Sequence, residues 1–209
     1  YGGFFLKQHK GAKIHAAFNN YYNLGIEAFE SENFHQAEEY FERAQEIQPN
    51  PKTYVNLAKT YLRKNENERV VAYLIENINN NIIKIDAEIR YLLGTAYFNL
   101  DDYPKAIWCF EEAIENEAGI YGEISSVYRD LAVSYGKVGE YDRAEDIIKT
   151  IINNSRFEKH IAQYIYAELN ILKRNYQEAQ GQLIAALEME PNNIRYMITL
   201  ARLHINLNN

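Results

Sequence analysis

The chain has 209 residues, 47 % of them hydrophobic, with a formal net charge of −7 and one cysteine, Cys109. A single cysteine excludes an intramolecular disulfide and suits a reducing compartment. The acidic charge argues against non-specific nucleic-acid binding, and no stretch has the roughly eighteen apolar residues of a membrane span. We therefore expect no nucleic-acid partner and no membrane span in this chain.

The charge is uneven at the N-terminus. Residues 1–17 contain three lysines and no acidic residue, so this segment is +3 and residues 18–209 carry −10. The segment is either a polar lead-in to the first helix or the basic flank of a membrane anchor upstream of Tyr1. The basic flank of an anchor would place the repeats on the cytoplasmic side. We expect a cytoplasmic chain, free or attached to a membrane.

Helical periodicity begins at about Ala16, where apolar residues recur at i, i+3, i+4 and i+7. Polar turns then divide the chain into predicted pairs of helices. The first predicted pair is 16–30 with 34–48, the second is a helix opening at Tyr54 with 68–78, and the third is 91–100 with 103–116. Two further pairs turn at Gly139 and before Tyr176, and a single helix over 194–206 follows.

A common pattern underlies these pairs: an apolar residue followed by a small one, a polar turn, then an aromatic residue with alanine three positions later. The first part recurs at Leu24-Gly25, Leu57-Ala58, Leu93-Gly94, Leu131-Ala132, Tyr166-Ala167 and Leu200-Ala201, at spacings of 33 to 38 residues. The second part recurs at Phe34-x-x-Ala37, Tyr103-x-x-Ala106, Tyr141-x-x-Ala144 and Tyr176-x-x-Ala179. Self-similarity at this period is typical of stacked helical hairpins, whose small residues mark points of close helix approach.

The pattern resembles the tetratricopeptide repeat, a helix–turn–helix unit of about 34 residues. The first unit matches it at Leu24, Gly25, Phe34, Ala37, Phe41, Ala44 and Pro49. The resemblance covers roughly residues 18–206. It implies an all-α fold, a right-handed superhelical solenoid of about five hairpins plus a closing helix, forming a single repeat domain over 18–209. It indicates little about function, because the family shares a scaffold and not a ligand.

The resemblance also implies that the first helices of the hairpins line a concave groove. The predicted ligand-binding residues are those that point away from the stripe of small residues: Tyr22, Asn56, Lys59, Arg63, Tyr91, Phe98, Arg129, Tyr164 and Arg202. Seven basic and four acidic residues at groove positions make this face about +3. Tyr91, Phe98 and Tyr164 are the expected apolar anchors, outside the joints between hairpins. The groove thus fits a peptide of some acidic character, unless the charges merely cover a solvated face.

The sequence predicts no catalytic residue, no cofactor and no metal site. Its five histidines lack the spacing of metal ligands, Cys109 is expected to be a buried thiol, and no glycine-rich phosphate loop occurs. The leading hypothesis is a non-catalytic scaffold that binds a peptide or partner protein. The alternatives are a docking or sensing segment of a larger enzyme, such as a kinase or transferase, and self-association through the open last repeat.

Overall fold

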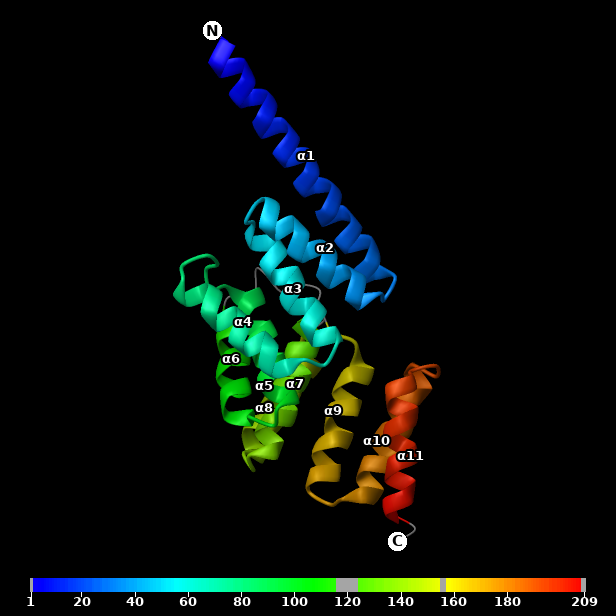
Figure 1. Ribbon diagram of the computed structural model, residues 1–209. Coiled ribbons are helices and arrows are strands. Elements are labelled where there is room, and N and C mark those ends of the chain that lie inside the picture. Colours follow the sequence, from blue (N-terminus) through cyan, green and yellow to red (C-terminus); the bar gives the residue numbers. More distant parts are fainter. Residues whose placement is uncertain (1, 116–123, 155–156, 208–209) are drawn as a thin grey trace. The chain divides into compact units, whose positions relative to one another are not determined.

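The computed structural model describes residues 2–115, 124–154 and 157–207, which form eleven α-helices and, within these ranges, no β-strand (Figure 1). The helices are α1 (Gly2–Glu30), α2 (Phe34–Ile47), α3 (Pro51–Arg63), α4 (Asn67–Asn79), α5 (Ala87–Asn99), α6 (Tyr103–Glu115), α7 (Ile124–Lys137), α8 (Tyr141–Asn153), α9 (Lys159–Leu172), α10 (Tyr176–Met189) and α11 (Ile194–Leu207). Five pairs and a closing helix follow one another along the chain, which confirms the predicted all-α repeat class. Among the described helices, none is long and apolar enough to cross a membrane.

Contacts between helices divide the chain into two compact units, Tyr1–Leu100 and Asp101–Asn209. In unit 1, α1 packs on α2, α2 on α3, α3 on α4 and α4 on α5. In unit 2, α6 packs on α7, α7 on both α8 and α9, α9 on α10, and α10 on α11. Packing between neighbours in sequence is the order of a hairpin stack. That residues 18–209 form a single domain stays a prediction.

The small residues predicted at the helix joints are buried. The alanines Ala37, Ala106, Ala144, Ala167 and Ala179 are each 0 % exposed. At Gly25, an added Cβ would lie 2.6 Å from the ring of Phe41 on α2. Helices α1 and α2 therefore approach so closely that any larger residue at this joint would displace the ring.

Each hairpin turn has three residues, and the middle one adopts a left-handed backbone conformation. The φ angles are 59° at Glu32, 61° at Asn65, 58° at Asp101, 84° at Gly139 and 61° at Arg174. In four of these turns the next residue donates its N–H to the carbonyl five residues earlier, as Glu66 does to Tyr61 at 2.9 Å. This is the Schellman arrangement, which satisfies the last carbonyls of the first helix.

Three helices begin earlier than the sequence pattern predicted. Helices α3 and α5 start at Pro51 and Ala87, because the side chains of Asn50 and Asp86 cap their first backbone N–H groups. Helix α1 starts at Gly2, and its N-terminal half runs beyond α2 (Figure 1). Residues 11–16 of α1 are all exposed, so this part of the helix has no buried stripe that a periodicity argument could detect.

Candidate functional site

The first helices of the hairpins carry the residues predicted to bind a ligand, and each unit has its own first-helix face: α1, α3 and α5 in unit 1, and α7, α9 and α11 in unit 2. On the face of unit 1 lies a hollow of about 310 Å³. It is lined by Tyr22, Pro51, Lys52, Val55, Asn56, Asp86 and Glu88. The structure thus brings the predicted residues Tyr22 and Asn56 together, and the amide of Asn56 donates to the Tyr22 hydroxyl at 3.0 Å.

The hollow of unit 1 is balanced in charge. The predicted groove lysine, Lys59, pairs with Glu88 at 2.5 Å, and Asp86 and Glu88 both contribute carboxylates to the lining. Paired charges of opposite sign attract a charged ligand only weakly. This hollow therefore offers little preference for an acidic partner.

Arg63, another predicted ligand residue, lies over the aromatic rings of the preceding hairpin. Its guanidinium carbon is 4.7 Å from the ring centre of Phe34, and 3.1 Å separates a guanidinium nitrogen from Glu32. The same contact recurs in unit 2, where Lys137 lies 5.7 Å from the Tyr103 ring and Lys173 lies 5.1 Å from the Tyr141 ring. A cation at the end of one first helix thus braces the aromatic residue that opens the preceding second helix.

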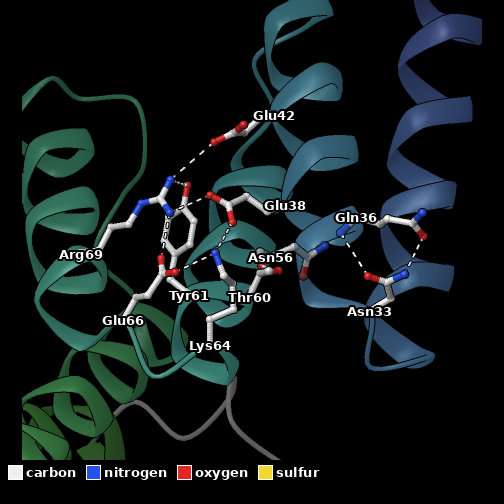
Figure 2. Close-up of polar contacts among 10 residues, drawn as sticks. All are labelled: Asn33, Gln36, Glu38, Glu42, Asn56, Thr60, Tyr61, Lys64, Glu66 and Arg69. Atoms are coloured by element: carbon white, nitrogen blue, oxygen red, sulfur yellow. Dashed lines mark hydrogen bonds and ion pairs between the residues drawn. The ribbon is translucent and has the colours of Figure 1, made fainter.

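A polar cluster joins the first two hairpins near their turns. In Figure 2, Glu38 of α2 lies between Lys64 and Arg69, and Glu66 binds the same two cations. The Glu38 carboxylate lies 2.5 Å from Lys64 and 2.6 Å from Arg69. Burial alone would lower the pKa of Lys64, but its hydrogen bonds to Glu38 and Glu66 outweigh burial and raise it. Hydrogen bonds from Lys64 and Arg69 lower the pKa of Glu66. The cluster is satisfied internally, so it stabilises the joint and leaves little for a ligand.

A related cluster occurs in unit 2. The guanidinium of Arg143 lies 4.4 Å from the ring centre of Tyr135 and pairs with Glu111 at 2.8 Å and with Glu140 at 3.2 Å. In unit 1, Arg69 makes the corresponding contacts with Tyr61, Glu42 and Glu66. Repetition at equivalent positions indicates a structural brace of the hairpin stack.

The face of unit 2 has a slightly larger hollow, of about 330 Å³. Its apolar floor is Val133, Ile171, Leu172 and Leu203, and its polar lining is Lys137, Glu168, Thr199 and Arg202. All three first helices of the unit contribute, and Arg202 was among the predicted ligand residues. We call this cavity the unit-2 hollow. It combines an apolar floor with two cations, one from α7 and one from α11.

A second cavity of about 260 Å³ lies on the same face and is more polar. It is lined by Ser125, Ser126, Arg129, Ile161, Tyr164, Asn193, Arg195 and Tyr196. The predicted ligand residue Arg129 is already paired with the buried carboxylate of Asp130 at 2.7 Å. Burial raises the pKa of Asp130, although the charge of Arg129 acts in the opposite direction.

The prediction that Tyr164 is an apolar anchor outside the joints is wrong. Tyr164 is only 4 % exposed and its ring stacks on Tyr196 of α11, with 4.6 Å between ring centres. Its hydroxyl donates to Glu168 at 2.5 Å. Tyr164 is therefore part of the core between α9 and α11, and its truncation would destabilise the unit. Tyr91 and Phe98 are half-buried on α5.

One group of potential metal ligands comes together in unit 2. Single ligand atoms of Glu158, His160 and Glu190 lie within 4.8 Å of one another. The two ring nitrogens of His160 already contact the Tyr196 hydroxyl, at 2.7 Å, and the carboxylate of Glu158. The sequence did not indicate this group, because Glu190 lies thirty residues beyond His160 and meets it only through the α9–α10 hairpin.

The fold and the two faces define a class: a chain of helical hairpins with hollows of ligand size on its first helices. Sequence profiles of the tetratricopeptide repeat match residues 19–51 and 87–120, so the chain contains tetratricopeptide repeats.

Known proteins similar to this chain include a curated sequence and two solved structures. The peroxisomal targeting signal receptor of Saccharomyces cerevisiae is 26 % identical over 117 residues, a match that spans 54 % of this chain and 18 % of the receptor. A thermophilic TPR protein of Thermus thermophilus has a TM-score of 0.67 at 20 % identity, covering 90 % of this chain and 99 % of its own. YrrB, described as a TPR protein with an unusual peptide-binding site, has a TM-score of 0.61 at 15 % identity, covering 86 % and 89 %. At these identities, the structures support the fold alone.

Proposed function

We propose that this protein is a non-catalytic interaction scaffold that binds a peptide segment of a partner protein on a first-helix face. The observation that carries the proposal is the unit-2 hollow, which joins an apolar floor to Lys137 and Arg202. An apolar cavity with a few placed polar groups is the usual form of a binding site. The 26 % identity to a peroxisomal targeting signal receptor over 117 residues supports the same class of function.

The lining defines the chemistry of the ligand. An aliphatic or aromatic side chain would occupy the floor formed by Ile171, Leu172 and Leu203, where burial of apolar area supplies most of the binding energy. Carboxylates next to that side chain would face Lys137 and Arg202, which mainly raise the association rate and make binding sensitive to salt. Glu168 in the lining would accept a hydrogen bond from a backbone amide of the peptide.

The test uses Arg202→Glu, which reverses one exposed charge at the rim of the hollow. An array of peptides with one leucine, isoleucine, phenylalanine or tyrosine between acidic residues supplies the probes, and the best binders are titrated against purified protein. Arg202→Glu should weaken their binding about tenfold or more, equal to about 1.4 kcal/mol. Arg174→Glu, an identical charge change at an exposed turn, is the matched control.

Equal affinity of the two variants for every peptide would remove the unit-2 hollow as the site. A docking segment of a larger enzyme would use the same face, so this measurement applies to that alternative as well. An independent scaffold and a docking segment of an enzyme would bind the peptide in the same way. They would differ only in whether the chain is joined to a catalytic domain.

A further inference from the structure

Helix α11 exposes an apolar stripe on the side opposite to its packed face. Tyr196 and Leu203 are buried, at 4 % and 1 %, within the core cluster that includes residues of α9 and α10. On the other side, Ile194, Met197, Ile198 and Ile205 are 68 %, 44 %, 47 % and 63 % exposed, and Ala201 is exposed among them. At 100° per residue these five positions fall within an arc of about 100°, the width of a helix-packing stripe.

The internal repeat shows what this stripe is suited to pack against. Ala201 holds the small-residue position of its helix, and the equivalent residues of the preceding first helices, Gly25, Ala58, Ala132 and Ala167, are all buried. In the first hairpin the covering element is known in detail, because the Phe41 ring of α2 lies directly on Gly25. Helix α11 therefore carries the face that a second helix covers elsewhere, with no such helix among the described residues.

Charge narrows the kind of helix that would fit. Residues 194–207 contain two arginines, Arg195 and Arg202, and no acidic residue. The second helices of the other hairpins are acidic: α2 contains four glutamates and one arginine, and α8 contains three acidic residues against two basic ones. A covering helix with acidic flanks would complement the two arginines of α11.

We propose that the exposed face of α11 binds an acidic amphipathic helix of a partner protein, which packs as the second helix of a sixth hairpin. A small residue of that helix would approach Ala201, and its larger apolar residues would cover Met197, Ile198 and Ile205. A second copy of this chain fits less well, because antiparallel pairing of two α11 helices brings arginines together. The acidic second helices of the copy, such as α2 and α10, are already packed on their own first helices.

A synthetic peptide with the sequence of residues 33–48 serves as the probe, because it carries the stripe of α2 and the acidic residues Glu38, Glu39, Glu42 and Glu46. Fluorescence anisotropy of the labelled peptide should show saturable binding, weak because the peptide must order on binding. A peptide with these four glutamates replaced by glutamine should bind more weakly, and the difference should shrink at high salt.

Two variants locate the binding face. Ala201→Trp places a bulky side chain at the contact point, and it should reduce affinity for the peptide about tenfold or more without lowering the melting temperature, since Ala201 is exposed. Gly181→Trp is the control: Gly181 lies on α10, is exposed, and an added Cβ there would meet no atom within 4 Å. This variant should bind the peptide like the parent.

Three results would overturn the proposal. One is absence of saturable binding to the parent protein. Another is equal binding by the two tryptophan variants, which would mean that the peptide exchanges with α2 in unit 1. The last is a concentration-dependent dimer of the parent, measured by light scattering, that Ala201→Trp converts to a monomer; this would assign the face to a second copy.

Discussion

Two threonines of α3 show how differently a buried hydroxyl is accommodated. Both Thr53 and Thr60 are 0 % exposed. The hydroxyl of Thr60 donates to the carbonyl of Asn56 at 2.7 Å, whereas that of Thr53 has no hydrogen-bond partner among the described residues. An unsatisfied buried hydroxyl loses its hydration without compensation.

We therefore expect Thr53→Val to raise the free energy of unfolding by about 1 kcal/mol, because it keeps the shape and removes the unpaired hydroxyl. The residues at the same repeat position in α5 and α7 are Ile89 and Val127, so a branched apolar side chain suits this site. Urea denaturation followed by circular dichroism measures the effect. Thr60→Val, which removes a satisfied hydroxyl, should give no increase; an equal gain from both would contradict the argument.

A half-buried carboxyl group in unit 2 should make stability depend on pH. Burial raises the pKa of Glu168 above its ordinary value of 4.5, despite the hydrogen bond from Tyr164 and the charges of Arg129 and Arg195. The folded protein thus binds this proton more tightly than the unfolded chain. Stability from this group therefore increases as the pH falls through the folded pKa towards 4.5.

Glu168→Gln removes this ionisation and should be more stable than the parent at pH 7, because the amide keeps an acceptor for Tyr164 without a partly desolvated charge. The difference should decrease as the pH is lowered from 7 to about 4.5, where the parent gains its proton. Thermal melts of both proteins across this range provide the measurement. A gap that widens on acidification would show that Arg129 and Arg195 hold the carboxylate in its charged form.

Residues at the same repeat position differ in their burial and contacts, which limits what the sequence alone could predict. Tyr22, Tyr91, Arg129 and Tyr164 all stand two residues before the recurring apolar position of the pattern, and all were predicted to face a ligand. Tyr164 is buried because Tyr196, thirty-two residues later, stacks on it. Lys59 and Arg63 are similarly paired with Glu88 and Glu32. The sequence indicated which side of its helix each residue occupies. It did not indicate which residues of the neighbouring hairpins each side chain contacts.

At the scale of the element, the hairpin turn is defined by backbone geometry and not by side-chain identity. Its left-handed position holds Glu32, Asn65, Asp101, Gly139 and Arg174 in turn. For a residue with a Cβ this conformation costs roughly 1 kcal/mol or more, and only glycine avoids the cost. The turn is nevertheless kept, and in four of the five turns the Schellman hydrogen bond fixes it.

Gly139→Ala should lower the free energy of unfolding by about 1 kcal/mol. An added Cβ meets no atom within 4 Å at this position, so the loss reflects backbone conformation alone. Arg174→Gly should give a small gain, since relief of strain is partly offset by the greater freedom of glycine in the unfolded chain. Arg174→Ala retains the strained φ and serves as the control. Chemical denaturation of the three variants tests the series, and a neutral Gly139→Ala would contradict it.

The elements themselves were largely predictable, for a local reason. Small residues such as Ala37 and Ala144 must be small because helices touch there, so the pattern records the packing directly. Residues 11–15 of α1 escaped prediction because they are all exposed and make no packing pattern, although alanine and lysine favour a helix. Capping by Asn50 and Asp86 likewise shifted two helix starts that periodicity placed too late.

At the scale of the whole molecule, packing between neighbours in sequence predicts that damage stays local. Gly25→Leu forces bulk against the Phe41 ring and should loosen α1 and α2. Hydrogen exchange measured by mass spectrometry should increase in these helices and remain unchanged in α9, α10 and α11 of unit 2, because stability in a repeat array is a sum of nearest-neighbour terms. Faster exchange throughout both units would instead show one cooperative domain.

The buried cysteine has a practical consequence. Cys109 lies on α6, is 0 % exposed and is the sole cysteine of the chain. A thiol reagent reaches it only when this helix opens. The rate at which the unmodified protein is labelled therefore measures how often the structure around α6 opens. The same protection means that a cysteine introduced at an exposed turn would be labelled alone, which makes the natural sequence ready for site-specific fluorescence without prior removal of a thiol.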